Sequence, residues 1–183
     1  TRELAVKVGM VFQDPENQLV TTDVEREIAF GMENLGFPKA VIARRMEEAL
    51  DTAGIADLRF RSLSELSGGE KQKVAIASVL ALHPEVLVLD EPTSELDPQS
   101  AEEVLRLLER LNDELGITVV LVEHRLDRVI HLVDRVIVID KGRIAASGKP
   151  REVVCNAGIP TTAGISIPPV IRLMQQLRNH GFN

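Results

Sequence analysis

The fold class of this chain follows from residues 66–92, which read LSGGEKQKVAIASVLALHPEVLVLDEP. Ser67 and Glu70 have the spacing of a helical capping box, so the segment predicts a helix over 69–82. The run 86–89 is apolar throughout, which is typical of a strand buried on both faces. A helix that leads into such a strand is the repeating unit of a parallel α/β sheet.

The same alternation continues on both sides of this stretch. Further strands are expected at 6–12, 117–122 and 136–139, and further helices at 98–115 and 126–133. Lys141-Gly142-Arg143 predicts a tight turn into an antiparallel hairpin at 144–147. The predicted class is therefore α/β, a doubly wound parallel sheet with helices on both faces and a hairpin at its edge.

A helical subdomain is expected at about residues 20–82. Thr22 and Glu25 have capping-box spacing and would open a first helix; Pro38 would begin a second helix, which Gly54 would end. The main domain is expected to span 1–155. Residues 156–183 are expected to form a linker and an amphipathic helical tail.

Composition limits the partners. Lys and Arg number 21 against 28 Asp and Glu, a net charge of −7 with both signs interspersed, so no basic stripe is available and no nucleic-acid partner is expected. Cys155 is the only cysteine, which excludes an intramolecular disulfide and suits a reducing compartment. No apolar run approaches the roughly 20 residues that span a bilayer.

The start of the 69–82 helix carries the first chemical signal. A capping box accounts for Ser67 and Glu70 but not for Gly68 and Gly69, each of which costs about 1 kcal/mol of helix propensity relative to Ala. Bare backbone amides at the positive end of a helix dipole attract phosphate. We therefore interpret the glycines as a place where a phosphate approaches the backbone.

The second signal is Asp90-Glu91, delivered by a buried strand to the carboxyl edge of the sheet, where open α/β folds bind ligands. In phosphoryl transfer one carboxylate holds Mg²⁺ and another accepts a proton from the attacking water. An Asp-Glu-Pro turn alone is compatible with ordinary turn chemistry. Gln13 and His124 also follow strands; His124 would donate to a γ-phosphate or be a hydrogen-bonded core residue.

These segments, with the polar loop 94–97, occur in the order and spacing of the ATP-binding cassette (ABC) ATPases, which the chain resembles. The resemblance implies a P-loop NTPase-like fold, the cofactors ATP and Mg²⁺, and a second ABC ATPase subunit in a head-to-tail dimer. It implies that Gln13 contacts Mg²⁺ and the lytic water, and that Asp90 binds Mg²⁺ through water. It also makes Glu91 the general base and His124 a γ-phosphate ligand.

The resemblance places the remaining site residues at the dimer contact. Ser67, Gly68, Gly69 and Glu70 would face ATP bound to the opposite subunit, and Asp97 would line the interface. Many relatives have Gln where this chain has Glu70, a departure that preserves capping.

A finer resemblance is carried by residues 11–19, VFQDPENQL, and 28–31, IAFG. They are similar to the ATPase subunits of energy-coupling-factor importers, which take up vitamins or cobalt and nickel ions. This implies a peripheral subunit on the cytoplasmic face of the membrane. A transmembrane component would dock between the helical arm and Gln13, with residues 14–19 on the wall.

Two other readings remain open, a soluble ABC ATPase and a non-catalytic partner cassette. The short arm between Gln13 and Ser67 leaves no room for the long coiled coil of many soluble ABC proteins. Intact Asp90, Glu91 and His124 argue against a degenerate site.

No segment of these residues fits the phosphate-binding loop G-x-x-x-x-G-K-[ST]; at Gly148-Lys149 the next residue is Pro150. The expectation is that the chain is the C-terminal, larger part of a longer cassette. Alone it is expected not to bind ATP tightly and to be inactive.

Overall fold

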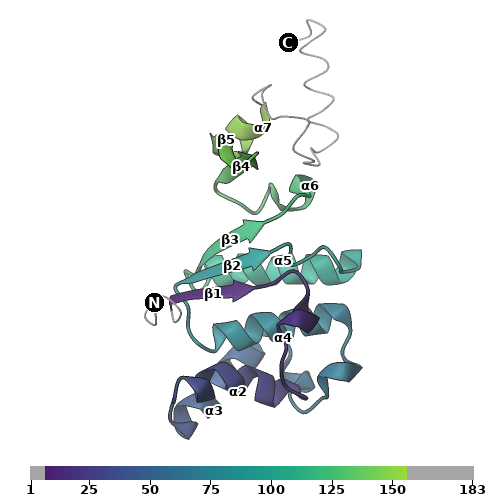
Figure 1. Cartoon of the computed structure of the whole chain (residues 1–183), viewed down its shortest axis with the longest axis vertical. Helices are drawn as coiled ribbons and strands as arrows, with labels where there is room; N and C mark the ends of the chain where they lie inside the picture. Colours follow the sequence, from purple (N-terminus) through teal and green to yellow (C-terminus); the bar gives the residue numbers. More distant parts are fainter. Residues whose placement is uncertain (1–6, 156–183) are drawn as a thin grey trace, which may run out of the picture. The chain divides into compact units, whose positions relative to one another are not determined.

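The computed structural model describes residues 7–155 of the chain (Figure 1). The chain divides into two compact units, one ending at Val122 and the other beginning at Glu123, and each is described by itself. The first unit contains a parallel sheet, two helices packed on the sheet, and a helical arm.

The sheet consists of β1 (Val8–Val11), β2 (Val86–Asp90) and β3 (Thr118–Val122), in the order β1-β2-β3. All pairs are parallel: Val11 lies opposite Leu89, and Leu89 opposite Leu121. The predicted parallel α/β core is thus present, and the carboxyl ends of the three strands share one edge.

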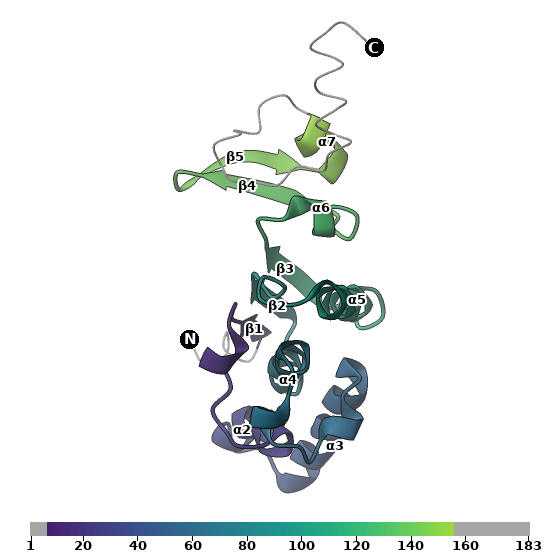
Figure 2. The ribbon, with the colours of Figure 1, turned by 90° about the vertical axis from the view of Figure 1, so that its right-hand side faces the viewer.

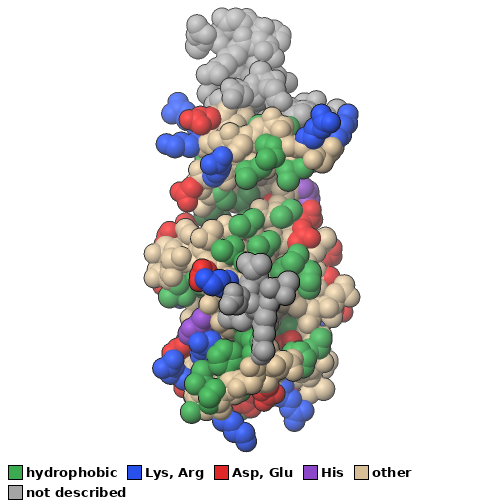
Figure 3. Space-filling view, turned by 60° about the vertical axis from the view of Figure 1, so that its left-hand side comes forward, with side chains coloured by type: hydrophobic (Ala, Val, Ile, Leu, Met, Phe, Trp, Pro, Cys, Tyr) green, Lys and Arg blue, Asp and Glu red, His purple; other side chains and the backbone are tan. Residues whose placement is uncertain are grey.

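Helices α4 (Gly68–Leu80) and α5 (Pro98–Asp113) pack on one face of this sheet (Figure 2). Val11, Leu87 and Leu89 on that face are fully buried. Residues on the other face, such as Met10 and Val122, are 47% and 49% exposed. Apolar side chains accordingly gather at the surface in the middle of the view in Figure 3.

The expectation that helices cover both faces is therefore wrong for the described part of this unit. Successive residues of a strand point to opposite faces. An apolar strand shows that both faces can be buried, but not which described element buries them.

The helical arm contains α2 (Val24–Asn34), α3 (Lys39–Ala53) and the short 3-10 turns η1 (Pro15–Asn17), η2 (Ala56–Leu58) and η3 (Leu63–Glu65). Its α2 packs on α4 through the buried Val24, Ile28 and Met32. Gly54 ends α3 with a φ of 67°, as predicted.

The predicted cap of α2 is wrong by one residue. Asp23 is the N-cap, and its side chain accepts a hydrogen bond from the Arg26 amide at 3.0 Å. Glu25 instead pairs with Arg59 at 2.6 Å, because the chain of η2 returns beside the start of α2. That tertiary contact removes Glu25 from the capping role.

The second unit contains α6 (Leu126–Val129), β4 (Val136–Asp140), β5 (Arg143–Gly148) and α7 (Pro150–Cys155). Strands β4 and β5 form the predicted antiparallel hairpin, with Val136 opposite Gly148. The expected place of β4 in the parallel sheet is not found, since among the described strands β4 pairs only with β5. Helix α6 is shorter than predicted.

The expected tail, 156–183, lies outside the described residues. Among the helices that are described, none is long and apolar enough to cross a bilayer.

Candidate functional site

The start of α4 is held by the predicted capping box. Ser67 Oγ accepts a hydrogen bond from the Glu70 amide at 3.3 Å, while Glu70 Oε2 accepts from the Ser67 amide at 2.7 Å and from the Ser67 hydroxyl at 2.8 Å. The two hydrogen bonds that the Glu70 carboxylate accepts lower its pKa, and the bond from the Ser67 amide contributes most. Glu70 thus orders the helix start with a charged carboxylate.

The two glycines at this start have different surroundings. A Cβ added at Gly69 would lie 2.7 Å from Cβ and Oγ of Ser100 on α5, a distance that real Cβ atoms essentially never show. A Cβ at Gly68 would meet only Leu96, at an ordinary 3.5 Å. Close packing of α4 on α5 therefore gives Gly69 a structural reason of its own, beside the predicted approach of a phosphate to its backbone, which stays a prediction. Of the two glycines, Gly68 is exposed, and no close packing contact requires a glycine there.

Strand β2 delivers Asp90 and Glu91 to the carboxyl edge of the sheet. Asp90 lies opposite Val122, and the Glu91 amide donates to the Val122 carbonyl at 2.9 Å, which extends the ladder by one bond. Both side chains are half-buried. Glu91 has a φ of 42°, in the left-handed region that costs a non-glycine residue roughly 1–3 kcal/mol. Such strain is common where a side chain must be aimed for function.

Gln13 leaves the same edge from β1. Val11 lies opposite Leu89, so Gln13 and Glu91, each two residues further on, follow neighbouring strands. Gln13 is exposed.

The turn after Gln13 is rigidly built. Asp14 caps η1 by accepting from the Glu16 amide and from Asn17 Nδ2, both at 2.9 Å. Gln18 Oε1 accepts from the Phe12 amide at 2.9 Å, and Glu16 forms an ion pair with Lys71 of α4. This ion pair ties the turn to the helix start.

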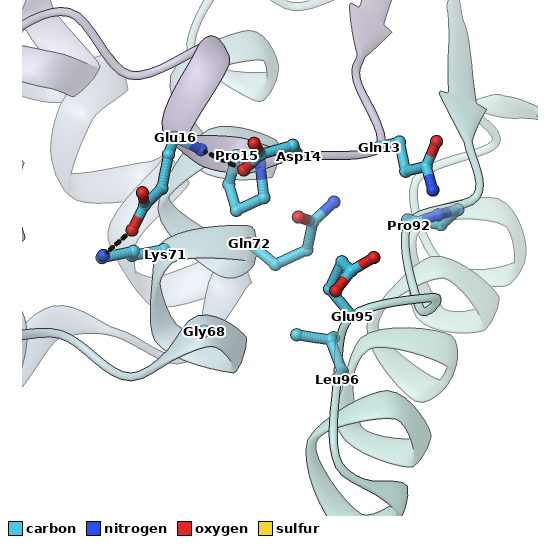
Figure 4. Close-up of a pocket in the computed structure, with 10 residues that line it drawn as sticks. All are labelled: Gln13, Asp14, Pro15, Glu16, Gly68, Lys71, Gln72, Pro92, Glu95 and Leu96. Atoms are coloured by element: carbon cyan, nitrogen blue, oxygen red, sulfur yellow. Dashed lines mark hydrogen bonds and ion pairs between the residues drawn. The ribbon is translucent and has the colours of Figure 1, made fainter.

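A cavity of about 330 Å³ lies between this turn, the start of α4 and the loop after β2 (Figure 4). It is lined by Gln13, Asp14, Pro15, Glu16, Gly68, Lys71, Gln72, Pro92, Glu95 and Leu96. A second cavity, of about 260 Å³, is lined by Ser67, Gly69, Glu70 and Ser100 among others. The predicted site residues thus fall into separate groups, since Asp90 and Glu91 line neither cavity.

Asp97 is the N-cap of α5. Its Oδ1 accepts from the amides of Gln99 at 3.0 Å and Ser100 at 3.1 Å. Hydrogen bonds from the Ser100 hydroxyl and amide lower the pKa of this exposed carboxyl. His124 is exposed and belongs to the second unit.

The expected Mg²⁺ ligands, Asp90 and Gln13, offer oxygen donors of the kind that Mg²⁺ prefers. The described residues hold no group of three or more His, Cys, Asp or Glu side chains suited to a metal ion. Mg²⁺ usually takes one or two protein ligands and completes its shell with water and phosphate oxygens. The oxygen atoms of Asp90 and Gln13 fit an ion that also takes ligands from water and nucleotide phosphate.

Comparison with known proteins decides the family. The ABC transporter family model matches residues 1–94. The chain belongs to the ABC transporter family. The energy-coupling factor transporter ATP-binding protein EcfA of Methanoculleus marisnigri is 46% identical over 180 residues, 98% of this chain and 65% of that protein. This confirms the predicted resemblance to ABC ATPases and to energy-coupling-factor subunits among them.

Solved structures agree with this ABC assignment. CbiO1 from Clostridium perfringens, described as part of the ABC transporter complex CbiONQ, is 38% identical with a TM-score of 0.80, over 95% of this chain and 69% of that one. The ATP-binding cassette MJ0796, a dimer bound to ADP and Pi, is 29% identical with a TM-score of 0.67, over 79% of this chain and 63% of that one. The predicted ABC ATPase, P-loop NTPase-like fold is confirmed. The chain spans about two-thirds of the EcfA relative's length.

Sequence reasoning missed two residues of this ABC cassette. Ser100, which faces Gly69, sits in α5 with no local signal of its role. Gln72 is only 1% exposed, and it shares a helix face with the buried Ile76 and Leu80. A polar residue on the apolar stripe of α4 is a signal that could have been read from the sequence.

Proposed function

We propose that this chain belongs to the ATP-binding and ATP-hydrolysing subunit of an ABC importer of the energy-coupling-factor type, peripheral on the cytoplasmic face of the membrane. The observation that carries the proposal is the strained carboxylate Glu91 beside Asp90 at the carboxyl edge of the sheet. The importer would take up a vitamin or cobalt or nickel ions, as the resemblance implies. The relatives named above support this choice over a soluble ABC ATPase.

In the proposed reaction, water attacks the γ-phosphorus of ATP, the bond to the β,γ-bridging oxygen breaks, and ADP leaves. Glu91 accepts the proton of the attacking water. Asp90, through water, and Gln13 would hold Mg²⁺, which would supply neutralisation of the phosphate charge; Gln13 would also contact the attacking water. His124 donates a hydrogen bond to a γ-phosphate oxygen.

Ser67, Gly68 and Gly69 act on a different nucleotide from Asp90 and Glu91. The resemblance to ABC ATPases supports this division, because it implies that the residues of the α4 start face ATP bound to the opposite subunit. A head-to-tail dimer brings the α4 start of one subunit to the ATP held by the other. Asp97, the exposed N-cap residue of α5, would line this contact between subunits and help to fix the geometry of the contact.

The dimer can be tested by complementation in the complete protein. We expect Ser67→Arg and Glu91→Gln each to hydrolyse ATP slowly. In a mixed dimer one site combines the intact Glu91 of one copy with the intact Ser67 of the other, so mixing should restore turnover at that site. Phosphate release at saturating MgATP measures it. A mixture as inactive as either variant alone would rule out sites shared between copies of this chain.

The membrane component is proposed to dock on the loop between η1 and α2. Residues 14–19 are proposed to form the wall of this docking place, and Gln18 among them also holds the backbone at the end of β1. Val20 is 62% exposed, and its amide donates to the buried Glu27 carboxylate at 3.0 Å, so an apolar side chain is presented on an ordered loop. This suits the apolar face of a coupling helix.

We expect Val20→Asp to reduce recovery of the membrane component by about tenfold, because an unpaired charge would be desolvated in the contact. The matched control is Leu115→Asp, a charge at another exposed apolar position, 56% exposed after α5. Co-purification from detergent-solubilised membranes measures both. Equal recovery of the Val20→Asp and unmodified complexes would place docking elsewhere.

A further inference from the structure

One buried polar group in the cavity of Figure 4 has no hydrogen-bond partner. The Gln72 side chain is 1% exposed, and its Nε2 is buried and unpaired. Leaving an amide donor buried and unpaired is unfavourable, so native structures rarely do so without a reason. Figure 4 shows this amide pointing into the cavity from α4.

Some of the hydrogen-bond acceptors on the cavity wall already have partners, and others do not. Both carboxylate oxygens of Asp14 are hydrogen-bonded, and Glu16 is paired with Lys71. Glu95 lines the same cavity as Gln72 (Figure 4), its side chain is exposed, and it forms no hydrogen bond or ion pair with any described residue. A carboxylate is a stronger acceptor than the Gln13 amide, the other free group on the wall.

Glu95 sits on the short loop between the end of β2 and the Asp97 cap of α5. Thr93 is 1% exposed and anchors the segment that follows β2. Beyond it, the Ser94 amide donates to the Glu91 carbonyl at 3.1 Å and the Leu96 amide to the Thr93 carbonyl at 3.4 Å. Glu95 already lines the cavity, so closure means that this turn brings its carboxylate onto Gln72.

We infer that Gln72 is a positioning residue, and that Glu95 closes onto it, its carboxylate accepting a hydrogen bond from Gln72 Nε2. The closure rests on the proposed function, because it links the α4 start to the loop between Glu91 and Asp97. In the closed state the cavity contracts, and the helix that presents Gly68 moves together with the loop that follows the general base. Glu95 is neither base nor ligand in this arrangement.

The kinetic test uses the complete protein with its partner subunits. Gln72→Met removes the donor at similar volume, Glu95→Ala removes the acceptor, and Glu95→Gln keeps an acceptor oxygen. We expect each of the first two to lower kcat about tenfold with little change in KM, as for an interaction made only on the way to the transition state. The double variant Gln72→Met/Glu95→Ala should be no slower than either single variant. Glu95→Gln should recover most of kcat.

Glu109→Ala is the matched control, because it removes an exposed carboxylate on α5 that does not line the cavity. It should keep the unmodified rate. Losses that multiply in the double variant would show that the two residues act separately and would overturn the inference. So would an unmodified rate for Glu95→Ala.

A second measurement does not depend on turnover. In a Cys155→Ser background, Gln72→Cys and Glu95→Cys should form a disulfide faster with ATP than without it, since closure brings the two positions together. Failure to cross-link in a protein that hydrolyses ATP overturns the closure. Cross-linking that ATP accelerates supports the closure, while the proposed function is judged separately, by the turnover of the protein in which Gln72 and Glu95 are intact.

Discussion

Glu91→Gln is expected to lower ATP turnover of the complete protein by about 10²-fold or more, the contribution typical of a positioned general base. The amide matches the carboxylate in shape but cannot take the proton of the attacking water. At a φ of 42°, glutamine and glutamate have the same unfavourable backbone conformation. The free energy of unfolding should therefore hardly change. The kcat at saturating MgATP and the ATP affinity should be measured together, and only kcat should fall.

The matched control for this substitution is Glu109→Gln, which makes the same change on the exposed face of α5. It should leave turnover unaltered. Full turnover in Glu91→Gln would mean that another group accepts the proton, and the proposed mechanism would be wrong.

Gly69→Ala is expected to reduce the free energy of unfolding by about 1–3 kcal/mol, the usual cost of overpacking. The added methyl would lie 2.7 Å from Cβ of Ser100, and both residues belong to helices that cannot separate without disturbing the sheet contacts of α4 and α5. Urea-induced unfolding, followed by circular dichroism, measures the change. Activity should fall as well, because the α4 start moves.

Two further variants make this prediction specific. Gly68→Ala meets only Leu96, at 3.5 Å, so its stability should be equal or higher by up to about 1 kcal/mol, the gain in helix propensity. Adding Ser100→Gly to Gly69→Ala removes both clashing atoms and should make the double change less destabilising than the sum of its parts. Equal destabilisation by Gly68→Ala and Gly69→Ala would contradict the packing explanation.

Several features were predictable from the sequence because they depend on covalent neighbours. The capping box of Ser67 and Glu70 joins residues three apart, and Gly54 ends α3 through its own backbone freedom. The apolar run of β2 and the position of Asp90 and Glu91 at its end are local in the same sense. The order of these segments was enough to indicate the ABC fold and the acidic pair of the site.

Other features required contacts between distant segments. Glu25 pairs with Arg59 because η2 returns beside the start of α2. Within residues 7–155, the pairing of β4 with β5 and the face of the sheet that helices cover likewise depend on which elements meet.

By itself, then, the sequence determined the family, the parallel α/β order of elements, the capped start of α4 and the acidic pair that ends β2. Only the tertiary structure decided why Gly69 must be glycine, that Glu91 is strained, and that Gln72 faces a cavity with an unpaired amide. The physical reason is how far apart along the chain the interacting residues lie. Caps and turns arise from bonds between near neighbours, whereas steric fit and burial depend on atoms that folding brings from elsewhere in the chain.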